Sequence, residues 1–267
     1  MLTNFHTHTY RCNHASGTEE EYILRAIEAG VGEMGFSDHG PYPMPNGYCS
    51  GFRMRTDTTG EYVATLAALR DKYREKIRIR IGFELEYYPK FFPDLSRHLA
   101  GFDFDYIIMG QHFIGNEIDN VGPHCTAGTE DEELLRIYVD QVCEGMRTGA
   151  YCYVAHPDVF TFLGDASVYD KHMIRLCETA RELDIPLEIN GLGIRTNRFY
   201  PHEAFWRLAG KVGNKAIFGC DAHDAPSAWD SASYAKAQAM AKTFGLDLVE
   251  RPDFEAHDPK KIFANYR

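Results

Sequence analysis

The sequence has no run of about 18 consecutive apolar residues, the length that a membrane-spanning helix requires. Its first residues also lack the basic stretch followed by an apolar stretch that marks a secretory signal. None of the seven cysteines forms a C-x-x-C pair, and a chain of 267 residues needs no disulfides to hold a core. These absences predict a cytoplasmic protein in a reducing compartment, with no membrane partner.

Positive charge is also scarce. Lysine and arginine together number 28 against 39 aspartates and glutamates, so the net charge is −11. Such a charge repels phosphate backbones, and binding to nucleic acid is therefore not expected. An anionic ligand would have to be held by a local positive centre. With 44% hydrophobic and 25% charged residues, the chain has the composition of a folded globular protein.

Short apolar runs alternate with longer amphipathic runs, a pattern typical of strand–helix units around a parallel sheet. The apolar runs predict seven strands, at 2–5, 33–36, 78–83, 106–109, 153–155, 187–189 and 216–219. The amphipathic runs predict helices at 61–73, 131–148, 170–182, 201–212 and 228–244. Thr18 and Glu21 predict a capping box for a further helix, which Gly30 ends. No linker or repeat is evident, so we expect one α/β domain over residues 1–267.

Two segments interrupt this rhythm, at 40–60 and 115–130, and both are rich in Gly, Pro, Asn and Thr. Loops of this kind commonly build the substrate face of a barrel. The aromatic residues in and beside them could stack an imidazole or a nucleobase equally well, and so do not discriminate between these ligands.

A residue type that can bind a metal follows nearly every predicted strand. Parallel strands of a barrel present all their carboxyl ends on one face, so we expect these groups to converge although they are far apart in sequence. At the end of the first strand, His6 and His8 can both turn toward one ion. With His14 from the following loop, the candidate ligands are His6, His8, His14, His39, Glu84, His112, His156, Asp221 and His223.

Nine candidate ligands exceed the needs of one tetrahedral zinc ion or of a two-metal site, and three metal ions are the natural number. Imidazole and carboxylate ligands suit Zn, Fe or Mn, and the sequence does not choose among them. The remaining histidines stay outside this set. We interpret His98, His172, His202 and His257 as structural, and His124 lies in the second insertion beside Cys125.

Several of these segments, in order along the chain, resemble the polymerase and histidinol phosphatase (PHP) family. They are His6-Thr7-His8, Ser37-Asp38-His39, Gly82-Phe83-Glu84, Gly110-Gln111-His112, Ala155-His156-Pro157-Asp158 and Gly219-Cys220-Asp221-Ala222-His223. The segments around His14 and at 188–195 are most similar to the stand-alone histidinol-phosphate phosphatase branch. Gly110-Gln111-His112 departs from the Gly-Ser-x-His more common in that branch, which bears on substrate preference.

The resemblance implies a distorted, TIM-like (β/α)7 barrel with three metal ions. It implies that His6, His8, Glu84 and Asp221 hold the first ion. Glu84 would bridge to a second ion held by His112 and His156. The third ion would be held by His14, His39 and His223.

The resemblance also implies a phosphomonoester hydrolase, with L-histidinol phosphate as the expected substrate in histidine biosynthesis. A hydroxide that bridges two metals is available at neutral pH as the nucleophile, and Glu84, Asp221 and His223 would be catalytic. Arg195, Arg198 and Arg53 are candidates to hold the phosphate, because a guanidinium group can bind two oxygens at once. Asp38 and Asp158 could orient neighbouring histidines or simply lie in turns.

Two other functions remain open. The first is hydrolysis of another small phosphoester, such as a nucleotide or sugar phosphate. The second is a non-catalytic metal-binding module. Structural zinc sites are closed and usually contain cysteine, so a thiol-free set of nine candidates favours chemistry over structure. The sequence does not predict an oligomeric state.

Overall fold

The computed structural model describes residues 1–119 and 121–264, and its strands form two parallel sheets. The first sheet has the order β1-β2-β3-β4 and the second the order β5-β6-β7. Their bounds are β1 Leu2–Asn4, β2 Val31–His39, β3 Arg78–Leu85, β4 Tyr106–Met109, β5 Leu187–Asn190, β6 Lys215–Gly219 and β7 Asp247–Val249. Single parallel bridges join Met109 to Val154 and Val154 to Leu187, so the two sheets form one curled parallel arrangement.

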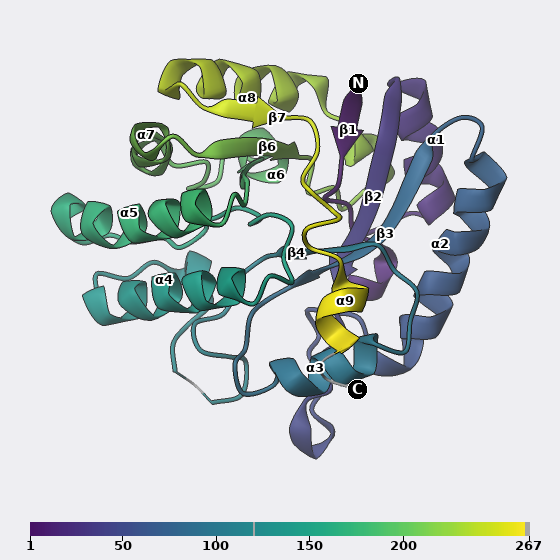
Figure 1. Cartoon of the computed structure of the whole chain (residues 1–267), viewed down its shortest axis with the longest axis horizontal. Coiled ribbons are helices and arrows are strands. Elements are labelled where there is room, and N and C mark those ends of the chain that lie inside the picture. Colours follow the sequence, from purple (N-terminus) through teal and green to yellow (C-terminus); the bar gives the residue numbers. More distant parts are fainter. Residues whose placement is uncertain (120, 265–267) are drawn as a thin grey trace.

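The helices pack on the outside of the strands. Helices α1 and α2 lie along one flank, and α4, α5, α7 and α8 are stacked along the opposite flank (Figure 1). Their bounds are α1 Glu19–Glu28, α2 Thr59–Tyr73, α3 Phe92–Leu99, α4 Glu132–Arg147, α5 Ala166–Glu182, α6 Gly191–Arg195, α7 Glu203–Val212, α8 Ser231–Phe244 and α9 Pro259–Phe263. No helix among the described residues is both long enough and apolar enough to cross a bilayer.

Most predicted elements are present, including the capping box in which Thr18 and Glu21 start α1. Helix α5 begins four residues earlier than predicted, because Asp165 caps it by accepting from the Ser167 amide. Helices α3, α6 and α9 were not predicted: each is short, and each contains proline or glycine, which weakens the helical signal.

One predicted strand is reduced to isolated bridges, and one strand was missed. The segment 153–155 contributes only single bridges at Val154, since the chain turns away at His156, where φ is +30°. Strand β7 was missed because it is a short strand at the edge of its sheet and none of its three residues is buried. The predicted α/β class with parallel strands is confirmed by the sheet pairing.

A small apolar cluster lies inside the curl of the sheets. Phe5, Tyr106, Ile108, Tyr153 and Ile217 come from both sheets and from the segment between them, and all are buried. The Tyr106 hydroxyl donates to the Phe5 carbonyl over 2.7 Å, which ties the end of β1 to β4. This cluster fixes the backbone directly before His6, so the first candidate ligand starts from a rigid position.

Candidate metal centre

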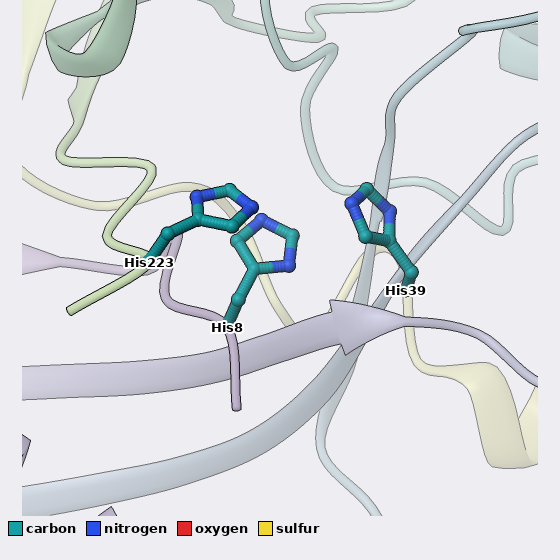
Figure 2. Close-up of side chains that lie close together, drawn as sticks. All are labelled: His8, His39 and His223. Carbon is teal, nitrogen blue, oxygen red and sulfur yellow. The ribbon is translucent and has the colours of Figure 1, made fainter. Parts of the chain in front are cut away.

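The ends of the parallel strands bring all nine candidate ligands together. In the sheet register His39 lies opposite Glu84, on adjacent strands β2 and β3. The His8 ring lies 4.4 Å from the His39 ring and 4.1 Å from the His223 ring, measured between centroids. Figure 2 shows these three imidazoles, which arrive from three separate segments. The His14 ring is 4.9 Å from that of His223, and the His112 ring is 4.9 Å from that of His156.

Four donor atoms lie close together at the centre of this cluster. The Nε2 atom of His6 is 3.4 Å from Glu84 Oε2 and 3.6 Å from Asp221 Oδ1. The Nε2 atom of His8 is 3.5 Å from Glu84 Oε2 and 3.2 Å from Asp221 Oδ1. Ligands held tetrahedrally at about 2.1 Å from one ion lie about 3.4 Å apart. The donor atoms of His6, His8 and Asp221 lie within 4.8 Å of one another, and Glu84 Oε2 lies within 3.5 Å of Nε2 of both histidines. Each of these spacings suits two ligands that share a cation.

Several of these donor atoms lack the partners that buried polar atoms normally have. Among the described residues, His6 Nε2, His8 Nε2 and Glu84 Oε2 are buried without a hydrogen-bond partner. Atoms of this kind are costly unless something binds them. A metal ion in their midst would satisfy all three, so the residues fit the metal that the ligand types suggest.

The second oxygen of Glu84 faces a different pair of histidines. Glu84 Oε1 lies 2.9 Å from His156 Nε2 and 3.5 Å from His112 Nε2. Its carboxylate thus has one oxygen toward each of two groups of imidazoles, which is the arrangement a bridging ligand needs.

Further donor groups lie beside His8. The donor atoms of His8, His39 and His223 lie within 4.8 Å of one another, and so do those of Cys12, His14 and His223. Cys12 was not among the candidates from the sequence, and its thiol is buried beside this part of the cluster.

The charges in the cluster are strongly coupled. Burial lowers the pKa of His6, but the carboxylates of Glu188, Asp221 and Glu84 outweigh it and raise that pKa to about 10. Burial and then the neighbouring His8 lower the pKa of His223 to about 3. Seven imidazoles therefore cannot all carry protons in this small volume. Metal cations can neutralise the two buried carboxylates without adding protons to the rings.

Comparison of the sequence with known protein families identifies the family of this chain. A sequence model of the PHP domain matches residues 4–191, which is more than half of the chain. The chain belongs to the PHP domain family. The matched region holds seven of the nine candidate ligands, and Asp221 and His223 follow it.

Relatives of this PHP domain include a probable histidinol-phosphatase from Deinococcus radiodurans. It is 31% identical over 231 residues, which cover 83% of this chain and 86% of the relative. A histidinol-phosphatase from Lactococcus lactis is 26% identical, and the match covers 91% of each chain. A crystal structure of histidinol phosphate phosphatase from L. lactis, complexed with zinc, L-histidinol and phosphate, superposes with a TM-score of 0.72. At 20% identity, covering 94% of this chain and 98% of the other, it supports the fold of the PHP domain.

A second layer of carboxylates holds the candidate ligands, and two of its members, Glu188 and Glu86, were not predicted from the sequence. Glu188 Oε1 lies 2.9 Å from His6 Nδ1, while Glu188 Oε2 accepts from the His156 amide over 3.1 Å. Asn190 donates to Glu188 over 2.8 Å and to Asp221 over 3.1 Å. One carboxylate therefore orients ligands of two groups, as outer carboxylates around metal sites commonly do.

Glu86 has the corresponding role for His112. Its Oε1 lies 2.8 Å from His112 Nδ1, and its Oε2 accepts from Arg53 over 2.9 Å. Arg53 in turn donates from Nε to Glu117 over 3.0 Å, so it ties the second insertion to the sheet. The pattern Glu84-Leu85-Glu86 could have indicated this role of Glu86, because side chains two residues apart on a strand share a face.

We expect Glu86→Gln to reduce kcat/KM by roughly 10- to 100-fold, the usual effect of removing such an outer partner. The amide keeps the size of the side chain but removes the charge that orients His112 and pairs with Arg53. Steady-state kinetics at saturating metal would measure the loss. An unchanged kcat/KM would show that His112 is oriented by packing alone. Glu182→Gln, at the exposed end of α5, serves as the control.

Two glycines allow the acids to approach this closely. A Cβ atom on Gly110 would lie 1.8 Å from Glu84 Oε1, and one on Gly219 would lie 1.8 Å from Glu188 Oε1. Any side chain at these positions would displace the carboxylates. Both glycines are therefore required by the centre itself.

The two aspartates that flank candidate ligands have different surroundings. Asp38 Oδ1 is 3.4 Å from His8 Nδ1, so Asp38 lies where it can orient that ring. Asp158 instead accepts from the His202 amide and from the Trp206 indole, 3.1 Å away, and so holds the start of α7. Burial raises the pKa of Asp158 to about 7.

A cavity of about 310 Å³ opens above the cluster. Its wall contains Phe52, His124, Thr126, Val159, Leu192, Arg198 and Tyr200 besides six of the candidate ligands, His14, His39, His112, His156, Asp221 and His223. A neighbouring hollow shares Thr126, Arg198 and Tyr200 with it, so the cleft continues outward past Arg198.

Of the three arginines proposed to hold phosphate, the structure brings only Arg198 to this cavity. Arg195 donates to the backbone carbonyls of Cys220 and Asp221, over 2.5 and 2.7 Å, and lines a separate hollow. Arg53 is 2% exposed and its guanidinium is occupied by Glu86 and Glu117. Both of these guanidinium groups already donate to buried acceptors, which the sequence does not reveal.

The four histidines interpreted as structural make contacts elsewhere. His98 Nε2 lies 3.0 Å from the Thr59 hydroxyl, His172 Nε2 lies 2.9 Å from Glu132, and His257 Nδ1 lies 2.9 Å from the Gly149 carbonyl. The His202 ring stacks on Phe199 with centroids 4.6 Å apart. None of them belongs to the donor groups named above.

Proposed function

We propose that this PHP domain is a metal-dependent phosphomonoester hydrolase that converts L-histidinol phosphate and water to L-histidinol and inorganic phosphate. The observation that carries this proposal is the buried donor cluster around Glu84, which faces an open cavity rather than a closed shell. A structural metal site would be closed. The names of the two relatives and the ligands of the L. lactis structure support the choice of substrate.

We propose three transition-metal ions, of Zn, Fe or Mn, held by the nine candidate ligands. When bound, such ions neutralise phosphate oxygens and lower the pKa of bound water to about 7. Two carboxylates and seven neutral imidazoles would leave the loaded centre with a positive charge. This local charge overcomes the repulsion that a net charge of −11 exerts on an anion.

The protein's own side chains would position the substrate. Arg198 lies at the mouth of the cavity, where its guanidinium can bind two oxygens of the phosphate. The rings of Phe52 and Tyr200 flank the cleft and offer apolar faces to the organic part of the substrate. A cavity of about 310 Å³ suits a small monoester, being near the lower limit of ligand pockets.

We also propose that the curled sheets form a closed, distorted (β/α)7 barrel. Segment 153–155 would fill the place between β4 and β5, and the bridge between Thr7 and Ala222 would close the ring between β1 and β6. The enzyme would act in the cytoplasm as part of histidine biosynthesis.

The decisive experiment compares kcat/KM for L-histidinol phosphate with that for p-nitrophenyl phosphate, sugar phosphates and nucleotides. A preference of a hundredfold or more, about 2.7 kcal/mol in transition-state binding, would establish the substrate. A larger kcat/KM for a nucleotide or sugar phosphate would move the assignment to that ester. Bound metal without turnover of any phosphoester would leave the binding module as the function.

We expect Arg198→Ala to raise KM for phosphate monoesters at least about tenfold, since a hydrogen bond to a charged group contributes about 1.5–3 kcal/mol. Arg198→Lys should recover part of the loss, because the charge remains while the two-pronged contact is lost. Arg207→Ala, on the exposed side of α7, is the matched control. An equal rise in KM from Arg195→Ala would reassign the phosphate contact to Arg195.

A further inference from the structure

His124 lines the cavity but belongs to none of the donor groups described above. Two backbone contacts fix its position. Phe113 and His124 form an antiparallel bridge, and the Cys125 amide donates to the His112 carbonyl over 2.8 Å. The His124 ring packs edge-on against Phe113, with centroids 5.1 Å apart, and its centroid is 6.1 Å from that of His112. These contacts hold the ring beside a candidate ligand.

The surroundings of His124 also determine which nitrogen carries the proton. The Thr126 amide donates to His124 Nδ1 over 3.3 Å, and the Thr126 hydroxyl lies 2.9 Å from the same nitrogen. A backbone N–H can donate only to a nitrogen with a free lone pair, so the proton of the neutral ring is on Nε2. Within residues 1–119 and 121–264, this Nε2–H has no hydrogen-bond acceptor. The ring therefore presents one fixed, neutral donor.

We propose that His124 is a catalytic residue whose Nε2–H binds the leaving oxygen of the phosphate ester. This inference rests on the proposed phosphatase function. Phosphoryl transfer places the attacking and leaving oxygens in line on opposite sides of phosphorus. With the attacking water on the side of the buried Glu84, the leaving oxygen points outward into the cavity, whose wall contains His124 and the exposed Arg198.

These two donors in the cavity wall have different chemistry. Arg198 carries a charge and matches the non-bridging oxygens of the phosphate. His124 offers a single neutral N–H donor. This suits one oxygen that becomes negative only as its bond to phosphorus breaks. In that step the water oxygen joins phosphorus, and the electron pair of the broken P–O bond moves to the leaving oxygen. His124 keeps its proton, and the water supplies, in net, the proton of the alcohol.

The leaving group provides the test. An alkoxide leaves as a strong base and needs the donor, whereas p-nitrophenolate is stable without it. We expect His124→Ala to reduce kcat/KM for an alkyl phosphate, L-histidinol phosphate or 2-glycerol phosphate, by about 100-fold, the effect of removing one such donor. For p-nitrophenyl phosphate the loss should stay within about threefold. Across a series of phenyl phosphates, the variant should show a steeper dependence on the pKa of the leaving phenol.

Further variants separate this role from others. His124→Gln keeps an N–H donor and should recover part of the alkyl activity, while His257→Ala removes a histidine outside the cavity and should change neither rate. Metal content of His124→Ala, measured by elemental analysis, should equal that of the wild type. Equal losses on alkyl and aryl esters would overturn the proposal and indicate a contact to the phosphate itself. Absence of turnover in the wild type would instead refute the proposed function.

Discussion

Replacement of Glu84 by glutamine should lower kcat by about 10³-fold or more, because metal stabilisation worth several kcal/mol would be lost. Both oxygens of this carboxylate face candidate ligands. Oε2 lies within 3.5 Å of ring nitrogens of His6, His8 and His39, and Oε1 lies 2.9 Å from His156. An amide offers one neutral oxygen and one N–H₂ group, which cannot bind a cation. The variant would lose the bridge between two groups of ligands.

Single-turnover kinetics and elemental analysis together measure this effect. We expect fewer equivalents of bound metal and a circular dichroism spectrum like that of the wild type, since glutamine has nearly the same volume. Glu182→Gln, a carboxylate-to-amide change at the exposed end of α5, is the control. If Glu84→Gln kept both its metal and most of its activity, Glu84 would not be a bridging ligand.

The convergence of the candidate ligands could be predicted because it follows from topology. Parallel strands present their carboxyl ends on one face, so residues as distant as His6 and His223 meet without any knowledge of loop structure. Apolar periodicity was sufficient to find six of the seven named strands and the longer helices. Where periodicity was weak, as in α6 with two glycines among five residues, prediction failed.

The surroundings of the centre were harder to predict. Arg195 and Arg53 have the right chemistry for phosphate, but both bind acceptors that only the folded chain reveals: two backbone carbonyls for Arg195, and the carboxylates of Glu86 and Glu117 for Arg53. A guanidinium that lines the cavity and one held by buried acceptors look the same in a sequence. The outer carboxylate Glu188, in contrast, stood two residues before Asn190 on a predicted strand and could have been found.

Removal of metal from the intact enzyme should abolish turnover and lower the melting temperature. Glu84 and Asp221 are buried among imidazoles, and without a cation their charges must be balanced by protonated rings. A metal present at about 1,000 times its Kd stabilises the folded state by about 4 kcal/mol, which corresponds to roughly 10 °C for a chain of this size. Differential scanning calorimetry before and after dialysis against a chelator measures the shift.

Adding one metal at a time back to the chelated protein then identifies which ions the centre uses. Because seven of the nine candidate ligands are imidazoles, Zn, Fe or Mn should restore both activity and melting temperature, whereas Mg, which prefers oxygen ligands, should restore neither. Glu84→Gln should show a smaller drop in melting temperature on chelation, since part of its metal is already lost. A purified protein that contains no transition metal, and whose turnover a chelator leaves unchanged, would show that the donor cluster binds no catalytic ion.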